Sequence, residues 1–167
     1  MAETTIKTDQ YLYCTIGNEQ YAISVSYVRE VLVVPKITRI PKMPPYMRGV
    51  INLRGSIIPL VDLRIRFGMT ETLISEDTAI IVLEIPKEED ELQSIGIFTD
   101  AVHSVISIDE SNLSPPPDIG TAIDTSFIMG MCEHNVDFFV VLDITSLFAT
   151  DELDILESVQ ADDGSAE

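Results

Sequence analysis

Hydrophobic and polar positions alternate along much of this chain, a pattern typical of half-buried β-strands. Two such runs, 10–16 and 19–23, flank Gly17 and Asn18, which tolerate positive φ, so the pattern predicts a first hairpin. Further strands are predicted over 31–34, 37–40, 50–53, 57–61, 78–85, 93–98, 127–132 and 136–142. The chain is therefore expected to be mostly β.

Helical structure is expected only in short pieces. Ser24 or Ser26 can cap a helical turn that runs through Val31. Asp62 can cap a second turn over 63–67, and Gly68 can close it. Loops are predicted over the acidic stretch 86–92 and over 115–126. Beyond the last strand, 151–159 is predicted to be helical and 160–167 to fray, so residues 151–167 form an acidic C-terminal helix or tail.

The pattern of the first half returns in the second half. A spacing of 81 relates Gly49, Asp62, Phe67 and the run 57–61 to Gly130, Asp143, Phe148 and the run 138–142, and a spacing of 74 relates Ile23, Val28, Val31 and Leu32 to Ile97, Val102, Val105 and Ile106. Chance matching of common apolar residues is the alternative explanation. A true repeat of short strands favours two small barrels over one doubly wound domain.

Length and composition agree with a compact protein. A chain of 167 residues with 46% hydrophobic residues can bury a core without disulfides. No apolar run approaches the ~18 residues that span a bilayer, and no signal peptide is present, so we expect a cytoplasmic protein. Cys14 and Cys132 are interpreted as small buried hydrophobes rather than disulfide partners or metal ligands.

Charge is distributed unevenly. The net charge is −18, yet eight of the ten lysines and arginines fall between positions 29 and 66, where Glu30 and Asp62 are the only acidic residues. This asymmetry favours an acidic partner for one face, and it argues against binding to nucleic acid or to an anionic membrane. Alternatively, the cations neutralise acidic residues folded against them.

Motifs for catalysis are lacking. The sequence has no glycine-rich phosphate loop, no histidine–carboxylate pair at metal spacing and no nucleophile elbow. We therefore expect no enzymatic activity and no cofactor.

Residues 47–67, MRGVINLRGSIIPLVDLRIRF, resemble the signature of the CheW family of chemotaxis coupling proteins. The blocks 28–31 (VREV) and 96–105 fit the family pattern in the expected order. The resemblance implies an all-β fold with short helices: two SH3-like five-stranded β-barrels on a shared hydrophobic core, related by internal duplication. We expect one domain over 10–150, with subdomains of approximately 10–77 and 78–150 whose strands could be exchanged.

The resemblance also implies a function. Members of the family are adaptors that join the cytoplasmic tip of methyl-accepting chemoreceptors to the regulatory domain of the histidine kinase CheA, in arrays that control a flagellum or another output such as pili. The positions that match the partner-binding pattern are Val28, Glu30, Gly49, Asn52, Leu53, Arg54, Gly55, Val102 and Val105.

Several of these positions also have a purely structural interpretation. Gly55 can simply supply the positive φ of its turn, Asn52 can bond its own turn, and the three valines can belong to the core. Glu30 and Arg54 are the strongest candidates, because charged side chains are rarely buried unpaired. Two other classes stay open: a generic SH3-like module for peptides or nucleic acid, which needs an exposed aromatic row, and an enzyme of unrecognised type.

Overall fold

The computed structural model describes residues 8–87, 91–115, 127–134 and 137–148. Within these ranges the chain forms strands β1 Thr8–Ile16, β2 Glu19–Ser24, β3 Val28–Val33, β4 Met47–Leu53, β5 Ser56–Val61, β6 Ala79–Pro86, β7 Leu92–Thr99, β8 Ala101–Asp109, β9 Ile128–His134 and β10 Asp137–Leu142. The helical pieces are η1 Val25–Tyr27, α1 Leu63–Arg66, η3 Glu110–Asn112 and α2 Ile144–Leu147.

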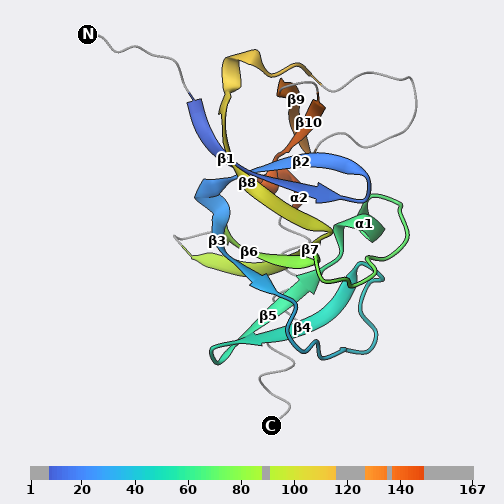
Figure 1. Cartoon of the computed structure of the whole chain (residues 1–167). Helices are drawn as coiled ribbons and strands as arrows, with labels where there is room; N and C mark the ends of the chain where they lie inside the picture. Colours follow the sequence, from blue (N-terminus) through green and yellow to red (C-terminus); the bar gives the residue numbers. More distant parts are fainter. Residues whose placement is uncertain (1–7, 88–90, 116–126, 135–136, 149–167) are drawn as a thin grey trace.

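The strands form two five-stranded sheets, one above the other in Figure 1. The upper sheet has the order β8-β1-β2-β10-β9, and the lower sheet has the order β3-β6-β7-β5-β4. Each sheet closes into a barrel through a bridge beyond its first strand: Thr38 pairs with Val50 of β4, and Ser114 pairs with Met131 of β9. The prediction of an all-β protein with two SH3-like five-stranded barrels is confirmed.

Each barrel takes strands from both halves of the sequence. The upper barrel contains β1 and β2 from the first half, and the lower barrel contains β6 and β7 from the second half. Two parallel seams join the halves, β2 with β10 and β5 with β7. The first hairpin of the chain, β1 and β2, therefore lies in the barrel of β8, β9 and β10, and the hairpin of β6 and β7 lies in the barrel of β3, β4 and β5. The division into subdomains at residues 77 and 78 stays a prediction.

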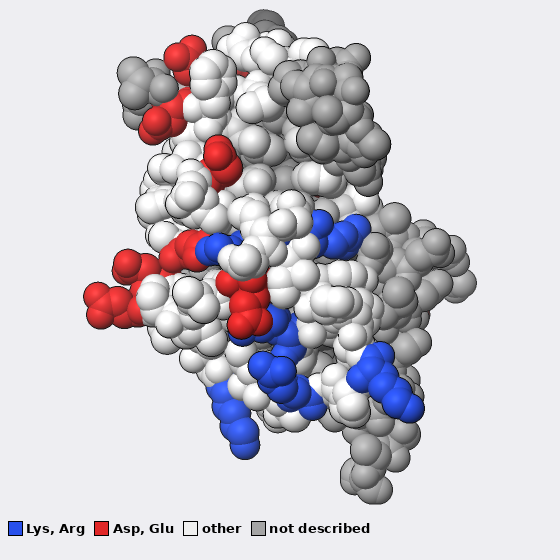
Figure 2. Space-filling view, turned by 90° about the vertical axis from the view of Figure 1, so that its right-hand side faces the viewer, with Lys and Arg blue, Asp and Glu red and all other residues white. Residues whose placement is uncertain are grey.

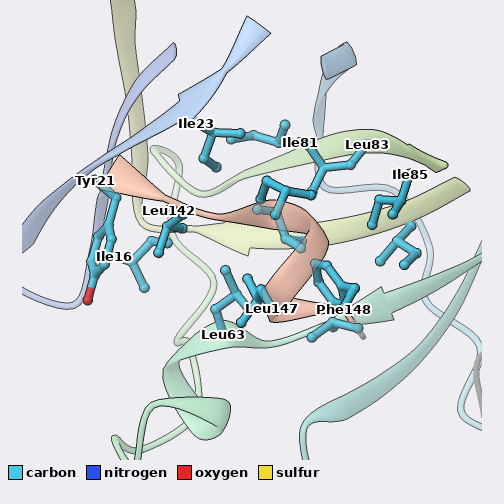
Figure 3. Close-up of a cluster of buried hydrophobic side chains, with 14 of the residues drawn as sticks. Ile16, Tyr21, Ile23, Leu63, Ile81, Leu83, Ile85, Leu142, Leu147 and Phe148 are labelled. Carbon is cyan, nitrogen blue, oxygen red and sulfur yellow. The ribbon is translucent and has the colours of Figure 1, made fainter. Parts of the chain in front are cut away.

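Buried side chains form one core inside each barrel and a third core between the barrels. β6 shows how one strand serves two of them. Ile80 and Val82 face the interior of the lower barrel, whereas Ile81, Leu83 and Ile85 face the core between the barrels. Because successive side chains of a strand point to opposite faces, burial on both faces explains the uninterrupted apolar run of this strand. Figure 3 shows the core between the barrels.

Residues that match at a spacing of 81 have equivalent structural roles. The amides of Arg64 and Ser146 donate to Asp62 and Asp143, the caps of α1 and α2. Asp62 is fully buried and also accepts hydrogen bonds from Arg48. Asp143 is partly exposed; burial raises its pKa, but hydrogen bonds, mainly from Ser146, outweigh this and leave the pKa below its usual value. The repeat therefore preserves a capping position in two different environments.

Three sequence predictions need correction. The helical turn predicted to run through Val31 ends at Tyr27, because Val28–Val33 pairs with β6 as a strand. The strand predicted over 37–40 is reduced to the single bridge at Thr38. β8, which pairs with β1 along nearly its whole length, was not predicted as a strand, since its polar residues are scattered. Residues 116–126 of the loop predicted over 115–126, and the helix predicted over 151–159, lie outside the described residues.

Candidate functional site

The β4–β5 turn projects an arginine from one end of the lower barrel. Arg54 and Gly55 are its two central residues, with φ of +50° and +91°, as in the type I′ turns that favour Asn-Gly. Asn52 accepts a hydrogen bond from the amide of Gly55 through Oδ1 at 2.9 Å. Gly55 supplies a turn conformation here, and Asn52 stabilises that turn. The side chain of Arg54 is 64% exposed.

Glu30 of β3 holds this arginine in place. Arg54 Nη2 donates a hydrogen bond to Glu30 Oε2, and Arg29 Nε lies 3.8 Å from the same oxygen. The hydrogen bond from Arg54 lowers the pKa of Glu30, and the same contact raises the pKa of Arg54. Glu30 and Arg54, the strongest candidates for partner contacts in the sequence, are joined by the fold into one ion pair with an exposed guanidinium.

Gly49 and Leu53 have internal roles. Gly49 lies in β4 with φ of +140°, and a Cβ built on it would lie 2.3 Å from the carbonyl oxygen of Thr38. Gly49 therefore permits the close approach of another backbone within the chain, at the bridge that closes the lower barrel. Leu53 is 8% exposed and packs in the core of the same barrel. Both residues belong to β4, the strand that leads into the turn, and they serve the packing of the lower barrel.

The three candidate valines occupy equivalent strands of the two barrels. Val28 at the start of β3 and Val102 in β8 are half-buried and pack against the core between the barrels. Val105 of β8 is 52% exposed, so its assignment to the core is wrong. Val31, its equivalent in β3, is exposed as well. Val102 and Val105 therefore lie on β8 of the upper barrel, whereas Val28 lies on β3 of the lower barrel, two residues before Glu30.

Sequence reasoning missed part of the surface beside Glu30. Alternate residues of β3 are exposed, and Val33 is 86% exposed. β3 is the first strand of the lower sheet and pairs along its length only with β6, so its outer face does not belong to a core. β-branched residues were assigned inward on their chemistry alone. Strand periodicity could have identified these exposed residues, because Val31 and Val33 point to the face of β3 opposite to that of Glu30 and Leu32.

The two barrels differ strongly in charge. Residues 8–27 and 100–148, which contain the strands of the upper barrel, include no lysine or arginine, against ten aspartates and glutamates. Figure 2 shows acidic side chains alone on the upper part of one face, both charges side by side at middle height, and cations alone on the lower part. Charge therefore gives the two ends of the molecule different electrostatic character.

Exposed aromatic side chains do not form a binding row on the first hairpin. Tyr11 and Tyr21 are buried in two different cores, and Tyr13 packs against Phe139 with ring centroids 4.6 Å apart. This arrangement removes the main support for a nucleic-acid or proline-rich peptide module. In the described part of the chain, no helix has the length and hydropathy needed to cross a membrane.

Fold and surface together define a protein-binding adaptor, in which two fused barrels present exposed side chains on rigid strands and turns. Residues 10–152 match the CheW-like domain family, so the chain belongs to the CheW family. Members of this family are non-enzymatic scaffolds of chemotaxis signalling, and this chain is such an adaptor.

Similar proteins carry the same description. The chain is 30% identical over 150 residues to the chemotaxis protein CheW of Klebsiella aerogenes, covering 90% of this chain and 87% of that protein. It is 34% identical to CheW of Treponema pallidum, covering 86% and 84%. The crystal structure of the scaffolding protein TtCheW from Thermoanaerobacter tengcongensis superposes with a TM-score of 0.75 and 36% identity, covering 87% of this chain and 96% of that one.

Proposed function

We propose that this adaptor joins a CheA-type histidine kinase to methyl-accepting chemoreceptors through two separate surfaces. The end of the lower barrel, with Glu30, Asn52, Arg54 and Gly55, binds the regulatory domain of the kinase. The margin between the barrels, with Val28 and Val102, and the nearby exposed Val105 bind the cytoplasmic tip of the receptor. On this proposal the protein works in the cytoplasm and reaches the membrane only through its partners.

The observation that carries the proposal is the conformation of Arg54. A left-handed backbone costs a non-glycine residue about 1–2 kcal/mol, and asparagine tolerates it better than arginine does. The chain nevertheless places an arginine there, exposes most of its side chain and orients it with Glu30. A guanidinium held in one orientation can bind a carboxylate through two hydrogen bonds at low entropic cost. Backbone strain of this kind is typical of functional positions.

The kinase surface can be tested with Arg54→Asn, a substitution that suits the turn and removes the guanidinium. We expect micromolar-range binding of the wild-type chain to the CheA regulatory domain by isothermal titration calorimetry. Losing a charge-assisted hydrogen bond of about 1.5–3 kcal/mol should weaken that binding at least about tenfold. Lys42→Asn is the matched control, because Lys42 is also a cation at positive φ, +64°, and lies outside the turn. Wild-type affinity in both Arg54→Asn and Glu30→Lys would remove this pair from the interface.

The receptor surface can be tested independently with Val105→Glu. Val105 is exposed, so the substitution should leave the fold intact. We expect it to abolish co-sedimentation with receptor cytoplasmic fragments while kinase affinity stays at the wild-type level. A loss of both activities would show that one surface serves both partners. The alternative output, a system that controls pili, would use the same surfaces, and the kinase recovered from cell extract would identify it.

A further inference from the structure

A group of exposed cations on the lower barrel has no acidic partner within the described residues. These cations, Lys36, Arg39 and Lys42, belong to residues 36–42, here called the cationic segment, which follows β3 and pairs with β4 at Thr38. The sequence contains no acidic residue between positions 31 and 61, so nothing nearby along the chain neutralises them. The proposed kinase surface at Arg54 does not include this segment.

The cationic segment borders a hollow suited to a mixed acidic and aliphatic ligand. The hollow has a volume of about 320 Å³ and is lined by Arg39, Ile40, Pro41, Met47 and Arg48. Arg48 is already bound to Asp62 at 2.7 Å, whereas exposed Arg39 is available on the rim. Apolar side chains beside unpaired cations fit a segment that alternates carboxylates with aliphatic residues.

The C-terminal segment of this chain has that composition. Residues 151–167 contain seven aspartates and glutamates and no lysine or arginine, and Leu153, Ile155, Leu156 and Val159 lie among the acidic residues. The upper barrel, which has ten acidic residues and no lysine or arginine, repels such a segment. The cationic segment is the part of the described surface where exposed, unpaired cations attract it.

The described part of the chain ends near the hollow, with α2 and Phe148. The carbonyl of Leu147 in α2 accepts a hydrogen bond from Arg66 Nη2 at 3.1 Å. The guanidinium of Arg66 lies over the ring of Tyr46, 5.3 Å from the ring centroid, and Tyr46 directly precedes Met47 in the lining of the hollow. Two side chains, those of Arg66 and Tyr46, therefore connect Leu147 with the hollow, and a segment of 17 residues is long enough to reach across it.

From these observations we infer that residues 151–167 bind the cationic segment and its hollow within the same molecule, and so shield it from other polyanions. Tethering through a few residues gives an effective concentration in the millimolar range, so individually weak charge contacts suffice. Salt screens exposed charges over about 8 Å at physiological strength, which makes the contact salt-sensitive.

The test measures proximity in the full chain, with no partner present. A nitroxide is attached at Ser158→Cys in a Cys132→Ser background, where the remaining cysteine, Cys14, is fully buried. We expect the amide NMR signals of residues 36–40, Lys42 and Met47 to lose most of their intensity and to recover in 0.5 M NaCl. Undiminished signals at residues 36–42, or losses confined to the upper barrel, would overturn the inference.

Charge variants separate specific binding from a general effect of net charge. The variant D151N/E152Q/D154N/E157Q should restore the signals. The control D9N/E19Q/E133Q/D137N changes the net charge equally on the upper barrel and should leave the signal loss intact. Contact between copies is detected in a mixture of a ¹⁵N chain without nitroxide and a ¹⁴N chain that carries the nitroxide. If the ¹⁵N signals lose as much intensity in this mixture as in the singly labelled sample, binding within one molecule is overturned.

Shielding has a separate readout with heparin as the polyanionic probe. The tail variant D151N/E152Q/D154N/E157Q should elute from a heparin column at higher salt than the upper-barrel control of equal net charge. The same tail variant carrying K36E/R39E/K42E should lose this retention. Identical elution of the tail variant and the control would contradict shielding. Failure of the kinase or receptor assays leaves these results unaffected, because none of them involves either partner.

Discussion

Replacement of Gly49 by alanine should damage the closure of the lower barrel. Gly49 has φ of +140°, and an added Cβ would lie 2.3 Å from the carbonyl oxygen of Thr38 and 2.9 Å from Cγ2 of Ile37. That carbonyl belongs to the bridge with Val50, whose two backbone hydrogen bonds measure 2.8 and 2.9 Å. The methyl group can be accommodated only if the segment around Thr38 moves away from β4.

The expected cost follows from these contacts. Two net backbone hydrogen bonds contribute about 2 kcal/mol together, and alanine in a sparsely populated backbone region costs a further 1–3 kcal/mol or so. The free energy of unfolding should therefore fall by about 3–5 kcal/mol. Gly55→Ala is the control, because Gly55 also has positive φ but no atom lies within 4 Å of its added Cβ. Its cost should be limited to about 1–2 kcal/mol of backbone strain.

Urea unfolding followed by circular dichroism measures the difference between these variants. With a slope of about 1–3 kcal/mol/M, Gly49→Ala should lower the midpoint by roughly 1–5 M, and Gly55→Ala by clearly less. The equivalent Gly130→Ala places its Cβ 2.9 Å from Leu113 Cβ without positive φ, so its effect should be intermediate. Equal midpoints for Gly49→Ala and Gly55→Ala would refute the closure role and return Gly49 to the list of partner contacts.

Three other outcomes are expected. Asp62→Ala should cost about 3–5 kcal/mol of unfolding free energy, because it removes the carboxylate partner of the largely buried Arg48 and leaves the buried amide and hydroxyl of Thr72 without their acceptor. Asp143→Ala should cost about 1 kcal/mol as a simple cap, and equal costs in chemical denaturation would contradict this difference. The fold lowers the pKa of Asp143, so the stability that its ionised form contributes is present above the unfolded-state pKa and is lost as pH falls through the folded-state pKa. With Asp143→Asn, the free energy of unfolding should therefore depend less on pH below about pH 4. Burial raises the thiol pKa of Cys14 to about 12. At pH 8 Ellman's reagent should therefore modify the half-buried Cys132 first and react with Cys14 only on unfolding, and faster reaction of Cys14 would be inconsistent with its burial.

Much of the architecture could be predicted from local chemistry. The turn at Gly17 and the cap at Asp62 each depend on a few adjacent residues, and the structure contains both. β3 was harder, because Val28–Val33 could continue the helical turn capped by Ser24 until the pairing with β6 was known. That pairing joins residues about 50 positions apart in the chain, and local propensity carries no information about it.

The candidate site shows the same limit. Glu30 and Arg54 stand 24 residues apart, and their ion pair depends on how the barrel closes. The exposure of Val105 depends on which face of β8 is turned outward, and a strand pattern alone leaves that open. Residue types could thus suggest candidate binding residues, but the tertiary fold determines which of these residues contact one another.

The exchanged hairpins make neither sequence repeat a self-sufficient folding unit. One repeat alone would leave a barrel short of two strands, with open sheet edges at β3 and β5 in the first repeat and at β8 and β10 in the second. Two copies of such a repeat could complete each other only as an intertwined pair related by a twofold axis. Joining the copies in one polypeptide removes the dependence of that pairing on concentration. It also holds the two barrels in one relative orientation, as the proposed binding of two partners requires.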